Sequence, residues 1–70
     1  MYYNKVLNMS KYEFEDYISD LTISNIEDIM NYISYEIIEC SGDKYRNLIV
    51  KLNIAEYVLD KMEINNEKSA

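Results

Sequence analysis

The apolar residues of this chain recur at intervals of three and four positions along three segments, which is the spacing of one face of an α-helix. Just before the first segment, Ser10 and Glu13 form a capping-box sequence, in which each side chain can bond the other residue's backbone N–H. This pattern predicts a first helix over about residues 11–20. Its apolar face consists of Phe14, Tyr17, Ile18 and Leu21.

A second, longer helix follows, and its apolar face consists of Ile26, Ile29, Met30, Ile33, Ile37 and Cys40. Two residues, Thr22 and Ser24, are candidates for its N-cap, because both side chains can accept a hydrogen bond from the first turn. We expect this helix to run to about Cys40. Gly42 then ends it, since glycine readily adopts the left-handed conformation found just after many helices.

The third apolar face consists of Tyr45, Leu48, Leu52, Ala55, Leu59 and Met62. Asp43 can cap this helix, which we expect over about residues 44–63. A connection as short as residues 41–43 joins antiparallel neighbours. The second and third helices are therefore predicted to form a long antiparallel hairpin.

The two ends of the chain carry weaker signals. Near the N-terminus, the apolar residues fit either a helical turn or an extended segment that covers the hairpin; they are Tyr2, Tyr3, Val6, Leu7 and Met9. Residues 65–70 hold no apolar side chain before Ala70, so we expect this tail to fray. The predicted fold is all-α. A single domain over residues 1–64 forms a three-helix bundle, with the short N-terminal helix packed on the long hairpin.

The composition excludes most kinds of catalytic and metal site. The 70 residues include no His, one Cys and one Gly, which excludes disulfide scaffolds, Cys–His zinc sites, His-dependent nucleophiles and glycine-rich phosphate loops. Pairs of carboxylates such as Glu36 and Glu39 lack the His that a di-iron bundle needs. A bundle of this size also leaves little room for a substrate pocket of ~300 Å³ or more. We therefore expect no enzyme activity, no metal and no cofactor.

The net charge of −6 is unevenly distributed along the chain. Residues 1–43 hold nine acidic and two basic side chains, a net charge of −7, whereas residues 44–70 hold four acidic and five basic ones. An acidic half repels the phosphates of nucleic acid and attracts basic protein surfaces. The expected partner is a larger basic protein, not nucleic acid or a membrane. Neither a signal peptide nor a membrane span is evident, and a lone Cys40 suits a reducing compartment, so we expect a cytoplasmic location.

A row of acidic and tyrosine side chains lies opposite the apolar face of the predicted second helix. It consists of Asp28, Tyr32, Tyr35 and Glu39, with Glu36 beside it. Tyrosine combines a large contact area with a hydroxyl group and is enriched in protein interfaces. We predict that this row binds a partner. The alternative is a solvated polar face whose tyrosines pack over neighbouring side chains.

The third helix carries a second apolar row, which consists of Val50, Ile54, Tyr57 and Val58. A helix that is apolar on most sides is buried on most sides. Two arrangements satisfy this condition. In a monomer, the first and second helices cover different faces of the third; in a homodimer, the row meets its own copy and enlarges the core of a domain that is small for independent stability.

Two hypotheses about function remain open at this stage. Ile, Asn, Tyr and Lys make up 32 of the residues, a bias typical of A/T-rich coding sequence in a low-GC bacterium or its phages. The leading hypothesis is therefore a phage- or mobile-element-encoded inhibitor, which occupies the nucleic-acid-binding surface of a host protein such as a CRISPR effector or another defence nuclease. The alternative is a homodimeric regulator or an antitoxin- or immunity-type protein that acts through the second apolar row of the third helix.

Overall fold

The chain forms three α-helices preceded by one short 3₁₀ helix. The computed structural model describes residues 4–69, with side chains as far as Ile64. The elements are η1 (Asn4–Asn8), α1 (Lys11–Ser19), α2 (Ile23–Ile37) and α3 (Gly42–Ser69). No strand occurs within this range. The predicted all-α, three-helix bundle is thus confirmed.

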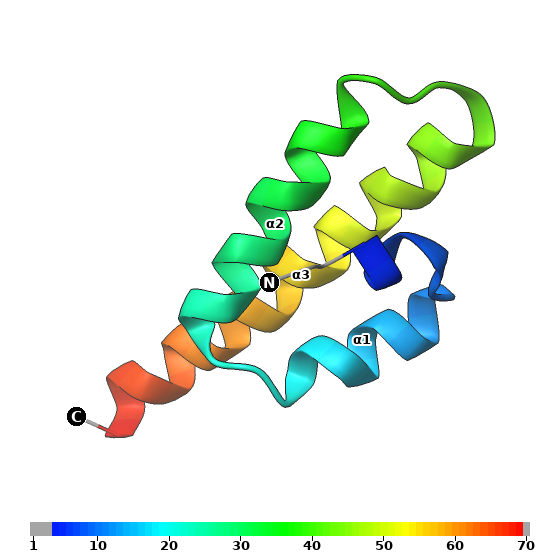
Figure 1. The fold of residues 1–70 in the computed structure, drawn as a ribbon. Coiled ribbons are helices and arrows are strands. Elements are labelled where there is room, and N and C mark those ends of the chain that lie inside the picture. The colour runs from blue at the N-terminus through cyan, green and yellow to red at the C-terminus, as the bar shows by residue number, and fades with distance from the viewer. Residues whose placement is uncertain (1–3, 70) are drawn as a thin grey trace.

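The helix that holds the bundle together is α3, because α1 and α2 both pack against it and contact each other much less. Figure 1 shows α2 and α3 running side by side in opposite directions, with α1 crossing at an angle to both. The molecule measures 42 × 22 × 19 Å. Its length matches that of α3, whose 28 residues span ~42 Å at about 1.5 Å each. The predicted antiparallel hairpin is present, and α1 and α2 cover different faces of α3.

The starts of α1 and α2 follow the capping signals in the sequence. Ser10 Oγ accepts a hydrogen bond from the Glu13 N–H at 3.2 Å, and Glu13 Oε1 accepts one from the Ser10 N–H at 3.4 Å. For α2 the N-cap is Thr22 and not Ser24, since Thr22 Oγ1 accepts from the Asn25 N–H at 3.2 Å. Each cap satisfies a backbone donor that has no partner inside its helix.

The connection between α2 and α3 differs from the predicted one. α2 ends at Ile37, three residues before the expected Cys40. The N–H groups of residues 38–40 donate to carbonyl groups three positions earlier, which tightens the chain into a turn. Gly42 has the expected left-handed conformation, with φ of 66°, but it begins α3 instead of ending α2.

The N-terminal segment forms η1 and lies against α3. Of the two conformations considered for it, the helical one is present over residues 4–8. Val6 is completely buried, and the Leu7 carbonyl accepts a hydrogen bond of 3.0 Å from Nζ of Lys51 on α3. Tyr2 and Tyr3 lie outside the described residues. The apolar packing of Val6 and Leu7, together with one charged donor, thus ties η1 to the bundle.

The core is assembled from the predicted apolar faces of all three helices, with Val6 of η1 added. Its largest fully buried side chains are Val6, Phe14, Ile18, Ile26, Ile29, Ile33 and Leu48. Complete burial of one such side chain stabilises the fold by ~1.5–3 kcal/mol relative to exposure. Tyr45, which was predicted in the core face of the third helix, is exposed instead. It stands in the first turn of α3, at the border of the apolar face.

The C-terminal end of α3 continues past the predicted boundary at Glu63 and reaches Ser69. Residues 65–69 contain neither glycine nor proline, so nothing in the backbone stops the helix. Figure 1 shows this end projecting past α1 and α2. Ala70 lies outside the described residues, and fraying of this end in solution stays a prediction.

Candidate interaction surfaces

The predicted partner-binding row lies on the outer side of α2, but its members differ in exposure. Tyr35 is 69% exposed, and Asp28 is also exposed. Tyr32 and Glu36 are half-buried. Glu39 is exposed but lies in the turn after α2, so it does not continue the row along the helix. Of the two tyrosines expected on this surface, one is available for a large contact.

Tyr32 belongs partly to the interior of the bundle. Its side chain packs against the buried cluster of apolar residues. Burial, and then the nearby Glu36 carboxylate, raise the pKa of the Tyr32 hydroxyl. Both effects disfavour the phenolate, because it would lose hydration and would face another negative charge. Tyr32 therefore matches the alternative, a tyrosine packed over its neighbours, while Tyr35 has the exposure that the interface prediction requires.

The acidic half of the sequence becomes an acidic surface on α1, α2 and the turns that follow them. The exposed carboxylates on these elements are those of Glu13, Glu15, Asp16, Asp20, Glu27, Asp28 and Glu39, while Asp43 is exposed at the start of α3. The two basic side chains of the same half lie over tyrosine rings. Nζ of Lys5 is 4.6 Å from the ring centroid of Tyr17, and Nζ of Lys11 is 5.2 Å from that of Tyr12. Two positive charges against nine negative ones leave this surface strongly acidic.

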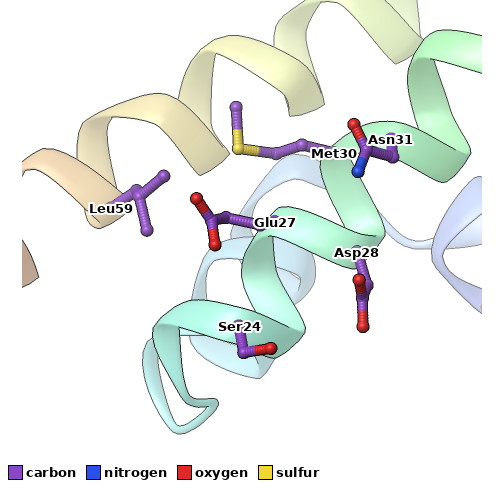
Figure 2. A pocket seen from close by; sticks show the side chains of 6 residues that line it. All are labelled: Ser24, Glu27, Asp28, Met30, Asn31 and Leu59. Carbon is purple, nitrogen blue, oxygen red and sulfur yellow. The ribbon is translucent and has the colours of Figure 1, made fainter.

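An open cleft of about 420 Å³ lies between α2 and α3. Its lining residues are Ser24, Glu27, Asp28, Met30, Asn31 and Leu59. Figure 2 shows Glu27 and Met30 reaching from α2 towards α3, where Leu59 stands, while Asp28 points away on the other side of α2. Both charged groups of the lining are carboxylates, so the cleft extends the acidic surface.

A second cleft, of about 400 Å³, separates the start of α1 from α3. Its lining residues are Met9, Ser10, Lys11, Asn47, Val50 and Lys51. Both clefts are open along the sides of α3 and are not enclosed substrate pockets, for which a bundle of this size was expected to leave little room. Because α1 and α2 pack mainly on α3 and little on each other, the bundle retains gaps along the sides of α3.

Among the described side chains, Lys51 is the one charged side chain that is buried, with 3% of its surface exposed. Its Nζ donates to the Leu7 carbonyl, and burial lowers its pKa because the ammonium group loses hydration. The sequence-based prediction missed this residue. The available signal was its position on the inner face of the third helix, between Leu48 and Ala55.

The second apolar row of α3 is divided between the core and the surface. Val58 was predicted on the possible dimer face, but it is only 7% exposed and belongs to the core of the single chain. It is therefore not available to a partner. Ile54 is half-buried, whereas Val50 and Tyr57 are 41% and 55% exposed. Nζ of Lys61 lies 4.5 Å from the ring centroid of Tyr57, and a side-chain hydrogen bond with Tyr57 is the main cause that raises the Lys61 pKa.

The described part of the chain lacks two further kinds of feature. It contains no cluster of three or more His, Cys, Asp or Glu side chains placed to hold a metal ion. None of its helices combines the length and apolar character needed to cross a membrane. In comparisons with known proteins, no family model, no curated protein and no solved structure matches the chain.

Proposed function

We propose that this protein is a non-enzymatic interaction module that binds a basic surface of a larger protein. The contact surface is the outer side of α2, with Asp28, Tyr35 and Glu36, followed by Glu39 in the turn after α2. The exposed carboxylates of α1 add to the negative charge of the same half of the chain. The observation that carries the proposal is the exposure of seven carboxylates of the acidic half on α1, α2 and the turns that follow them. Both lysines of that half lie over tyrosine rings.

The charge of this surface favours a partner rich in Lys and Arg. Opposite charges across an interface increase the association rate and set specificity more than they add affinity. Carboxylates also make short, charge-assisted hydrogen bonds with guanidinium groups, often two at once. A surface with this charge therefore fits a basic groove and repels a second acidic surface.

Tyr35 supplies the apolar part of the proposed contact. Its ring is mostly exposed on the last turn of α2, between the carboxylates of Asp28 and Glu39 in the sequence. Tyrosine buries a large area at low cost in side-chain entropy, and its hydroxyl can pair with the partner. An aromatic anchor surrounded by charges that match the partner is a common arrangement for an interface of few residues.

The basic groove of a nucleic-acid-binding protein is the target that these features fit best. Such grooves present Lys and Arg to phosphates, and carboxylates on a helix can occupy the same positions. We infer an inhibitor that competes with DNA or RNA for such a groove in the cytoplasm. A host defence nuclease, such as a CRISPR effector, is the class of target that the A/T-rich composition favours for a phage or mobile-element protein.

The test begins with capture of binding proteins on the tagged, full-length chain from a low-GC host, at low and at high salt. A captured protein is then mixed with a fluorescent 20-base-pair DNA or the matching RNA, and displacement is followed by anisotropy. We expect the protein to displace the nucleic acid. We also expect capture to weaken as salt screens the charges.

Two matched variants separate the proposed surface from charge in general. The double variant Asp28→Lys/Glu39→Lys reverses two carboxylates on the proposed surface. The control, Glu56→Lys/Glu63→Lys, makes the same change in net charge on α3, where both carboxylates are also exposed. We expect at least about tenfold weaker binding for the first variant alone. Equal binding by both variants, or a bound partner that keeps its nucleic acid, would contradict the proposal.

A further inference from the structure

The outward side of α3 carries a line of exposed apolar side chains that the acidic surface does not use. Val50, Tyr57 and Ile64 stand seven residues apart, and all three are exposed. With Lys61, which is exposed, and Ile54, which is half-buried and packs partly against the core, they give the spacing four, three, four, three. This is the heptad spacing of a helix that packs along a second helix, and a single lysine at such a position is known to specify register. We call these five residues the α3 seam.

The backbone of α3 extends past the rest of the bundle at its C-terminal end. Figure 1 shows it projecting beyond the ends of α1 and α2. Short helical segments without tertiary contacts are marginal in water, since most helix stability in proteins comes from packing of an apolar face. Ile64 lies at the start of this end and is half exposed. In an antiparallel pair centred on Asn53, Ile64 would lie beside the start of the partner's α3, at the edge of the contact.

The charges beside the seam favour a second copy of the chain as the partner. Arg46, Asn53 and Asp60 follow the seam at intervals of seven residues, and all three are exposed. If a second α3 lies antiparallel to the first, Arg46 meets the partner's Asp60 and Asn53 meets the partner's Asn53. The same register places Val50 against the partner's Ile54. Asp43, the first acidic residue of α3, then meets the partner's Lys61.

This complementarity distinguishes the outward side of α3 from the rest of the surface. α1 and α2 present nearly uniform negative charge, which would repel a copy of itself. The outward side of α3 instead alternates acidic and basic groups, so it is complementary to its own reversed copy. We propose that the protein forms a two-fold symmetric dimer by antiparallel packing of the α3 seam.

The dimer goes beyond the proposed function and does not depend on it. Because the seam lies on α3 and the acidic surface lies on α1 and α2, both acidic surfaces stay accessible in the dimer. Two such surfaces on one particle would allow bivalent binding, in which the second contact forms at high effective concentration. The dimer also buries apolar area that a domain of this size otherwise leaves in water.

The first test measures the mass of the full-length protein by light scattering after size exclusion, from dilute samples up to about 200 µM. We expect a shift from 8.4 kDa towards twice this mass as concentration rises. Tyr57→Lys should remain monomeric throughout. Tyr35→Lys is the matched control, since it makes the same change at an exposed tyrosine of α2, and it should dimerise normally. Circular dichroism checks that both variants keep their helix content.

The second test is a charge swap that reports orientation and register. Arg46→Glu should weaken the dimer at least about tenfold, because it places like charges opposite each other. Adding Asp60→Arg to this variant should restore the dissociation constant of the dimer to within about threefold of the wild-type value. Residues 46 and 60 lie ~21 Å apart along one helix, so they cannot pair within a chain.

Three results would overturn the dimer. The first is a wild-type protein that stays at 8.4 kDa at every concentration. The second is a dimer that Tyr57→Lys leaves intact. The third is a charge swap that fails to restore what Arg46→Glu removed, since this would exclude the antiparallel register. None of these outcomes depends on the partner sought for the acidic surface, so either proposal can fail alone.

Discussion

Lys51 offers a direct test of how η1 is held on α3. Its side chain is almost completely buried, and its Nζ donates to the Leu7 carbonyl at 3.0 Å. We compare Lys51→Met, which keeps most of the aliphatic stem, with Lys51→Ala, which removes it. Both variants lose the same hydrogen bond and the same buried charge. The difference between them therefore isolates the packing of the stem.

The magnitude follows from the atoms removed. A hydrogen bond from a charged donor contributes ~1.5–3 kcal/mol, but the desolvation of the ammonium group opposes it. We therefore expect Lys51→Met to lie within about 1.5 kcal/mol of the wild type. Lys51→Ala additionally loses buried methylene groups at ~0.8 kcal/mol each and leaves a cavity. It should be less stable than Lys51→Met by ~2–3 kcal/mol.

The pH dependence gives an independent check. The pKa of Lys51 is lowered in the fold by burial, so the unfolded chain binds this proton more tightly than the folded chain does. The free energy of unfolding should then rise with pH as the pH passes from the lowered pKa to the ordinary lysine value. Tyr32 acts in the opposite sense, since its raised pKa makes stability fall as the pH passes above the ordinary tyrosine value. Subtracting the free energy of unfolding of Lys51→Met from that of the wild type removes the Tyr32 contribution, because both proteins contain Tyr32.

The assay is urea denaturation followed by circular dichroism at several pH values, with stability taken from midpoint and slope. The difference between wild type and Lys51→Met should increase towards alkaline pH. Two results would refute the reasoning. One is equal stability of Lys51→Ala and Lys51→Met, which would mean that the stem is not packed. The other is a wild-type advantage that does not change with pH.

The remaining predictions concern the backbone. Ser10→Ala and Thr22→Ala should each destabilise the fold by ~1 kcal/mol in urea denaturation, because each removes an N-cap acceptor. Ser24→Ala, which changes the rejected cap candidate, should shift stability by less than about 0.5 kcal/mol, and a larger loss there would contradict the assignment. Gly42→Ala should cost ~1–2 kcal/mol through its positive φ alone, since an added Cβ meets nothing within 4 Å. Gly42→Asn should cost less, because asparagine tolerates this conformation better, and equal losses for the two variants would point to another cause.

The helices themselves could be predicted because the signals that form them are local. Ser10 and Glu13 cap α1 across three residues, and the apolar spacing of Ile26, Ile29 and Ile33 is set within one helix. The end of α2 could not be predicted in the same way. The helix ends at Ile37, and the next three N–H groups donate to carbonyl groups three positions earlier. No glycine or proline near residue 38 marks this change in the sequence.

The sequence identified the residues on the outer side of α2, but it did not show which of them are exposed. The pattern places Tyr32 and Tyr35 on one side of the helix, yet Tyr32 packs against the core and Tyr35 does not. A difference of three residues rotates a side chain by about 60° about the helix axis, on a helix of 3.6 residues per turn. That rotation decides whether the side chain meets another helix, and the position of the other helix is not encoded in the spacing.

The sequence by itself determined the all-α class, the N-cap candidates, the inner faces and the separation of charge along the chain. These follow from contacts between residues three or four apart and from counting charges. The tertiary structure decided which parts of α3 are covered, burying Val58 and leaving Val50 and Tyr57 exposed. It also placed Lys51 under η1. The coverage of α3 depends on the angles at which α1 and α2 pack against it, and the Lys51 hydrogen bond joins residues 44 positions apart. Helical periodicity carries no information about those angles.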